Sequence, residues 1–106
     1  MLDRIGDKWT SMAIKSLAEQ APNELRFSEM QRALVGISAK VLSQTLRNLE
    51  HDGLVARRIE ATRPPSVYYS LTALGLSLDG PLAAVREWAE ANVARIEAAH
   101  AQSGSA

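Results

Sequence analysis

Residues 26–53 of this 106-residue chain read RFSEMQRALVGISAKVLSQTLRNLEHDG, and this stretch decides the fold. Ser38 stands where an N-cap belongs, and the helix that it opens carries core-forming residues at helical spacing until Gly53. That spaced set is Val41, Leu42, Thr45, Leu46 and Leu49. Ahead of it, residues 29–34 predict a short helix with Ser28 as its cap and Gln31 at the capping-box position, ended by Gly36. Two helices joined by a tight turn indicate a helix-turn-helix.

The flanking segments extend this unit into a single domain. Apolar residues at steps of three and four predict a helix over about 2–19, and residues 25–27 form a short extended piece. Residues 54–59 and 67–71 alternate like strands, and Pro64 and Pro65 between them predict the tip of a hairpin. Thr72 caps a short helix over about 73–78, Gly80 and Pro81 open a last helix that reaches about residue 100, and residues 101–106 are expected to be frayed.

The predicted fold class is therefore mainly α with a small β-hairpin (α+β), a winged helix-turn-helix with a C-terminal dimerisation helix. One domain over residues 1–100 accounts for the whole pattern, with the helix-turn-helix at about 28–52 and the wing at about 54–71. The dimerisation helices are expected at about 2–19 and 81–100.

Composition excludes several classes of function. The 106 residues contain no cysteine, which rules out thiolate chemistry, disulfides and cysteine-ligated metals within them. No phosphate-binding glycine loop, nucleophile elbow or metal-ligand spacing is present, so we expect no catalytic residue, no metal and no cofactor, and not an enzyme. The longest apolar run, residues 82–85, is too short to span a membrane, and we expect a cytoplasmic protein.

Six segments in order resemble the HxlR-type family of bacterial transcriptional regulators, whose architecture is similar to that of MarR-type regulators. They are residues 6–10 (GDKWT), 26–30 (RFSEM), 36–42 (GISAKVL), 46–54 (LRNLEHDGL), 64–72 (PPSVYYSLT) and 74–75 (LG). Each segment alone is a weak signal, but together they cover about residues 2–90. The resemblance implies a dimeric winged helix that binds operator DNA and regulates nearby genes.

The residues themselves support DNA binding by the helix after Ser38. Its polar positions lie away from the leucine stripe, where side chains can meet base edges in a major groove. An arginine pairs with guanine and a glutamine with adenine, whereas a serine at the helix start is better placed for a phosphate. The candidates on this helix are Ser38, Lys40, Ser43, Gln44 and Arg47.

Charge placement adds further DNA-binding candidates. The net charge is zero, yet residues 26–63 carry seven basic and four acidic residues, a net charge of +3. Arg63 beside two prolines is expected at the wing tip, near a minor groove or a phosphate. Arg57 and Arg58 point to opposite faces of one strand, so at most one of them meets the phosphates. Arg26 and Arg32 flank the first helix of the pair and are candidates for backbone contacts.

The last helix carries an apolar stripe that needs a partner surface. We expect this stripe, with the first helix, to form a two-fold homodimer that reads a two-fold DNA site. The predicted interface residues are Leu2, Ile5, Leu82, Val85, Trp88, Ala89, Val93 and Ile96. Packing within one chain is the alternative.

The sequence thus predicts a regulator, more readily a repressor than an activator, that binds double-stranded operator DNA as a homodimer. Two alternatives stay open: a regulator that responds to a small-molecule effector bound near the dimer interface, and a winged-helix module that docks proteins without DNA. Many HxlR-type proteins carry a cysteine just ahead of the segment that matches residues 6–9, and in some of them its oxidation changes DNA binding. These 106 residues have none, so we expect no thiol-disulfide switching through them.

Overall fold

The first described helix begins immediately after Asp7. The computed structural model describes residues 7–105, and helix α2 spans Lys8–Gln20. The backbone of Asp7 is extended (φ −70°, ψ 133°), and its carboxylate accepts a hydrogen bond of 2.7 Å from the backbone nitrogen of Trp9. This N-cap breaks the helix that the sequence predicted from about residue 2, and residues 2–6 of that prediction lie outside the described residues.

Helices α3 (Phe27–Ala33) and α4 (Ala39–His51) form the helix-turn-helix. The predicted cap of the first of them is wrong: Arg26, and not Ser28, is the N-cap of α3. Phe27 is already helical, so Glu29 occupies the third helical position, where its Oε1 accepts a hydrogen bond of 2.8 Å from the backbone nitrogen of Arg26.

Helix α4 follows the sequence prediction closely. The Ser38 hydroxyl accepts a hydrogen bond of 3.1 Å from the backbone nitrogen of Val41, which confirms the predicted N-cap. The buried residues of the helix are Leu42, Thr45, Leu46 and Leu49. Val41 differs from the prediction, because it is 41% exposed and does not belong to the buried stripe. Glycines with positive φ stand before and after the helix, at Gly36 and Gly53.

A three-stranded antiparallel sheet contains the predicted hairpin. Strands β2 (Val55–Glu60) and β3 (Ser66–Leu71) form the wing, together with residues 61–65 between them. Strand β1 (Leu25–Arg26) pairs with the other edge of β3, so the strand order is β1-β3-β2. The sequence indicated β1 only as an extended piece, because its pairing with β3 joins residues more than 40 positions apart.

Helix α5 (Ala73–Ser105) is one continuous helix where the sequence predicted two. Pro81 lies inside it. A proline removes one backbone hydrogen bond, and here Leu78 and Leu82 on either side pack against the core, which holds the helix together across that gap. Residues 101–105, for which a frayed end was predicted, are helical as well, in keeping with the alanines that precede them.

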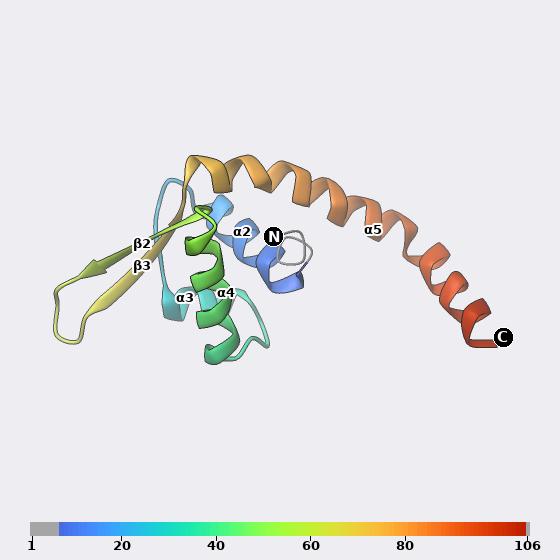
Figure 1. Cartoon of the computed structure of the whole chain (residues 1–106), viewed down its shortest axis with the longest axis horizontal. Helices are drawn as coiled ribbons and strands as arrows, with labels where there is room; N and C mark the ends of the chain where they lie inside the picture. Colours follow the sequence, from blue (N-terminus) through green and yellow to red (C-terminus); the bar gives the residue numbers. More distant parts are fainter. Residues whose placement is uncertain (1–6, 106) are drawn as a thin grey trace.

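The core lies where α2, α3 and α4 meet the sheet and the first turns of α5. Its fully buried large side chains are Ile14, Leu17, Met30, Leu34, Leu42, Leu46 and Leu49. The second half of α5 extends beyond this body, which gives the molecule dimensions of 58 × 26 × 22 Å (Figure 1). Among the described residues, no helix combines the length and the apolar character that crossing a membrane requires. The architecture is a winged helix-turn-helix with a long C-terminal helix, as predicted.

Candidate nucleic-acid interface

The polar side of α4 is open to solvent. Lys40, Gln44 and Arg47 are exposed, and Ser43 is half-buried. The amide nitrogen Nε2 of Gln44 donates a hydrogen bond of 3.0 Å to Oδ1 of Asn48, one helical turn further on. Asn48 was not among the candidates predicted from the sequence, although its spacing of four residues from Gln44 is the signal that pairs them. This face presents donors and acceptors of the kind that read base edges.

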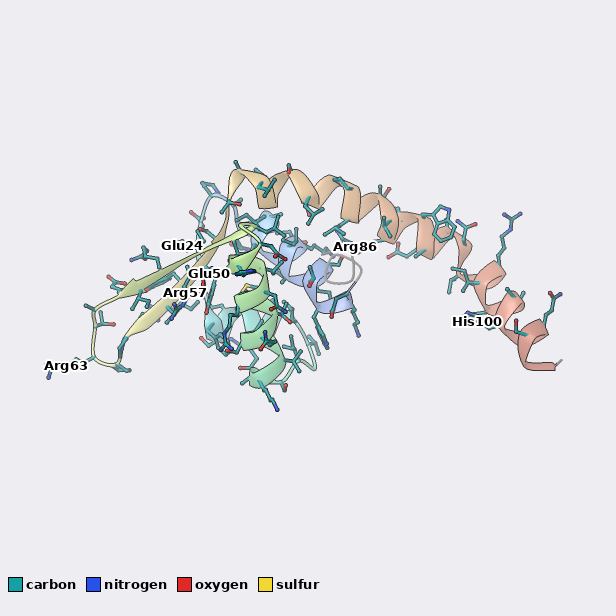
Figure 2. All side chains as sticks on the ribbon, in the orientation of Figure 1. Glu24, Glu50, Arg57, Arg63, Arg86 and His100 are labelled. Atoms are coloured by element: carbon teal, nitrogen blue, oxygen red, sulfur yellow. The ribbon has the colours of Figure 1, made fainter. Side chains whose placement is uncertain are left out.

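A cleft of about 160 Å³ separates α4 from the wing. Its lining residues are Ser43, Leu46, Arg47, Glu50, Arg57 and Tyr69. Arg47 comes from α4 and Arg57 from β2, so two guanidinium groups border one groove, with the carboxylate of Glu50 between these elements. Figure 2 shows Glu50 and Arg57 where the end of α4 approaches the base of the wing.

The tip of the wing carries Arg63 away from the rest of the molecule (Figure 2). The side chain is exposed. Beside it, the Thr62 hydroxyl donates a hydrogen bond of 2.8 Å to the carbonyl oxygen of Pro64 and lies 3.3 Å from the hydroxyl of Ser66. The tip is therefore ordered by its own contacts and leaves the guanidinium of Arg63 extended into solvent.

Arg57 and Arg58 lie on opposite faces of β2, as their alternation predicted. Arg57 borders the α4 cleft, whereas Arg58 is bound within the chain to Glu24. Its Nε lies 3.1 and 3.0 Å from the two carboxylate oxygens of Glu24, and its Nη2 lies 2.8 Å from Oε1. These hydrogen bonds hold the pKa of Glu24 below its usual value and raise that of Arg58.

Arg26 belongs to the same side of the sheet as Arg58. Its Nη2 donates a hydrogen bond of 3.0 Å to the hydroxyl of Tyr68. The structure therefore engages both Arg26, a candidate for DNA-backbone contacts beside α3, and Arg58, a candidate for phosphate contacts from β2, in contacts within the chain. Arg32, in the last turn of α3, is exposed.

The predicted dimer stripe divides into a buried part and an exposed part. Leu82 differs from the prediction, because it is 6% exposed and packs in the chain's own core, where it contributes to holding α5 on α2. Val85, Trp88 and Val93 are 62%, 60% and 49% exposed. Ala89 is exposed and Ile96 half-buried. Leu2 and Ile5 lie outside the described residues.

No group of three or more acidic, histidine or cysteine side chains within residues 7–105 is arranged to hold a metal ion. The geometry instead consists of an exposed helix face, a neighbouring groove bordered by arginines, and an arginine-tipped wing. These features suit a long polyanion, because they are spread along one side of the molecule and present cations and hydrogen-bond donors.

Comparisons with known proteins agree with this geometry. Residues 4–97 match the family described as HxlR-like helix-turn-helix. The chain is 35% identical over 96 residues to the uncharacterized HTH-type transcriptional regulator YtfH of Escherichia coli, covering 91% of this chain and 74% of that protein. A putative transcriptional regulator ytfH from Salmonella typhimurium has a similar structure, with a TM-score of 0.79 and 33% identity over 93% of this chain and 86% of that one.

The redox regulator HypR in its reduced form is also similar, with a TM-score of 0.75 and 35% identity over 92% of this chain and 93% of that one. The family and these relatives are regulators of transcription and not enzymes, which agrees with the sequence prediction. The chain belongs to the HxlR-like helix-turn-helix family of DNA-binding transcriptional regulators.

Proposed function

We propose that two copies of this chain bind a pseudo-palindromic DNA operator, with α4 of each copy in a major groove and each wing on the flanking duplex. The observation that carries the proposal is the open polar face of α4 beside the arginine-bordered cleft. An α-helix fits the major groove, and Lys40, Gln44 and Arg47 face solvent on the side of α4 away from its buried residues.

Side-chain chemistry assigns a contact to each exposed group. Arg47 suits guanine O6 and N7, and Gln44 suits adenine N6 and N7 once its amide turns from Asn48 to the base. Lys40, Ser38 and Ser43 lie along the same helix and suit phosphates or base edges. Arg57 in the cleft suits a phosphate, and Arg63 suits a phosphate or a narrow minor groove beyond the half-site.

The exposed stripe of α5 supports a homodimer. Three large apolar side chains, Val85, Trp88 and Val93, are about half or more exposed on a helix that extends beyond the body. A surface of this kind is favoured as a contact with a second copy. Two copies related by a two-fold axis would read two inverted half-sites about one helical turn apart, roughly 34 Å.

Of repression and activation, repression needs the fewest contacts beyond those to the operator DNA. A dimer that occupies an operator excludes other proteins from the same DNA by volume alone. We therefore propose a cytoplasmic repressor in a bacterial cell, tested by placing the selected operator over a reporter promoter. Lower expression with the regulator present supports repression, and higher expression indicates activation.

Selection of bound sequences from a random duplex library, with the purified chain, tests the main proposal. A two-fold consensus with salt-dependent affinity is the expected result, since phosphate contacts release counterions. The absence of duplex binding at low salt would instead favour a protein-docking module. A consensus without two-fold symmetry would contradict the dimer.

A regulator that responds to a small molecule is the second candidate. A cavity of about 250 Å³ lies between α2 and α5, bordered by apolar groups of Met12, Leu82, Val85 and Ala89 and by Arg86. The Nη1 of Arg86 donates a hydrogen bond of 2.6 Å to the Ser11 hydroxyl across this space. Compounds that change both the melting temperature and the operator affinity would support an effector site here.

A further inference from the structure

A cluster of four polar side chains lies on the face of the sheet opposite α4. It consists of Glu24, Arg26, Arg58 and Tyr68, and we call it the Glu24 cluster. Arg26, Tyr68 and Arg58 occupy directly opposed positions on β1, β3 and β2, so their side chains form one row across the sheet. The Arg58 guanidinium lies 4.4 Å from the centroid of the Tyr68 ring, and that of Arg26 lies 5.3 Å from it.

Glu24 completes this row from outside the sheet. It stands just before β1, and its carboxylate binds Arg58 with both oxygens while the Arg58 guanidinium packs over Tyr68. The Tyr68 hydroxyl in turn accepts a hydrogen bond from Arg26. The cluster thus joins both strands of the wing to the segment that enters α3.

The position of the row along the wing gives it a mechanical role. Strand β1 is only two residues long and pairs with β3 at Tyr69 and Tyr68. From Val67 outward, β3 pairs with β2 alone among the described strands, although Val67 itself still packs against the core. The Glu24 cluster therefore lies at the last row where a strand outside the wing pairs with it.

Small changes in the wing's direction at this row become large at its tip. Five residues separate Arg58 from Arg63, which corresponds to roughly 16 Å of extended chain. A tilt of about 10° at the row would displace Arg63 by about 3 Å, which is enough to break a hydrogen bond to DNA.

We propose that Glu24 is a positioning residue for DNA recognition: by binding Arg58 against Tyr68, it sets the direction of the wing and so the place of Arg63 on the operator. The inference rests on the proposed operator binding. It reverses the ordinary electrostatic expectation for an acidic residue in a protein that binds a polyanion. Neutralising such a residue ordinarily strengthens DNA binding, and here it would also free Arg58.

The test compares Glu24→Gln with Glu60→Gln in the full chain. Glu60, on β2, is exposed, and its removal changes the net charge by the same amount while the hydrogen bonds between Glu24 and Arg58 stay in place. We expect Glu60→Gln to bind every duplex as well as or better than the parent protein. Glu24→Gln should bind the selected operator about fivefold or more weakly, with affinity for an unrelated duplex unchanged or raised.

Two further variants separate positioning from a general structural effect. In an Arg63→Ala background, Glu24→Gln should cause little additional loss of operator affinity, because the group that it positions is already absent. The exchanged pair Glu24→Arg with Arg58→Glu keeps the total charge and should recover most of the operator affinity. Melting temperatures should stay close to that of the parent, since exposed ion pairs contribute little to unfolding.

Operator binding by Glu24→Gln that equals or exceeds that of the parent would overturn the inference. So would a loss of the same size with and without Arg63, or a large fall in melting temperature that accounts for the loss and persists in the exchanged pair. If the parent protein binds no duplex, the proposed function itself fails, which is a separate and distinguishable result.

Discussion

Arg47 lies on the exposed face of α4 and borders the cleft that also contains Arg57. We expect Arg47→Ala to weaken binding to the preferred operator by about 1–3 kcal/mol and to relax the consensus at one position in each half-site, because the side chain is assigned to a guanine. Repeating the duplex selection with the variant measures both effects.

Lys15→Ala is the matched control, since it removes the same charge from an exposed site on α2. It should leave the consensus unchanged. If Arg47→Ala also selects the parent consensus with the parent affinity, then Arg47 does not contact a base.

Gly75 lies in close contact with the backbone of Leu54, just before the wing begins. It is buried in the first turns of α5, and a Cβ placed there would overlap the carbonyl oxygen of Leu54. Because the obstacle is backbone, we expect Gly75→Ala to lower the free energy of unfolding by about 2 kcal/mol or more, measured by urea denaturation. Leu74→Ala, which trims an exposed neighbour, should change it by about 0.5 kcal/mol or less. Equal effects of the two substitutions would contradict this close contact.

At the residue scale, the sequence predicted local roles better than distant ones. The Ser38 cap and the opposite directions of Arg57 and Arg58 depend on neighbours within a few positions, and both are confirmed. The partners of Arg26 and Arg58 could not be predicted in the same way, because Tyr68 and Glu24 lie 42 and 34 positions away. Only the folded sheet brings these groups together.

The helices and strands show the same difference between local features, which could be predicted, and long-range ones, which could not. The helix-turn-helix and the wing were predictable because glycines, an N-cap and a change from helical to alternating spacing define their ends. The continuity of α5 was not predictable from the sequence, because Gly80 and Pro81 favour a break locally. Packing of Leu78 and Leu82 against the core keeps the helix continuous. The two-residue strand β1 is too short for any periodic signal.

The exposed stripe of α5 is the element on which the proposed dimer depends. We expect Val93→Glu to give a monomer at micromolar concentration, because it places a charge in an apolar contact. Sedimentation velocity measures this directly. Truncation after Gly80 is a less specific test, since it also removes Leu82 from the core.

Ala94→Glu serves as the control for this substitution. It adds the same charge to the next residue, which faces about 100° away around the helix and is exposed. This variant should remain a dimer and keep the parent melting temperature. A dimeric Val93→Glu protein would place the interface elsewhere.

For the whole molecule, the absence of cysteine from the 106 residues bears on how the chain responds to oxidants. The similar protein HypR is described as a redox regulator, whereas the 106 residues here contain three methionines and no cysteine. We expect diamide to leave operator affinity unchanged, since it oxidises thiols and Met30 is fully buried. Titrations with and without diamide measure this. A reproducible change in affinity, with methionine masses unaltered, would contradict the prediction.

The unbroken course of α5 has a consequence for the spacing of the DNA sites. The helix begins two residues after the wing ends and continues through the exposed stripe. The number of helical residues between the wing and the stripe therefore fixes the rotation of the stripe about the helix axis relative to the wing. One alanine inserted after Ala84, between Leu82 in the core and the exposed stripe, would turn Val85, Trp88 and Val93 together by about 100° and advance them by about 1.5 Å relative to the wing. Seven inserted residues would restore the angle to within about 20° while adding about 10.5 Å. The first insertion should abolish the two-fold consensus, whereas the second should preserve assembly and select half-sites at a different separation.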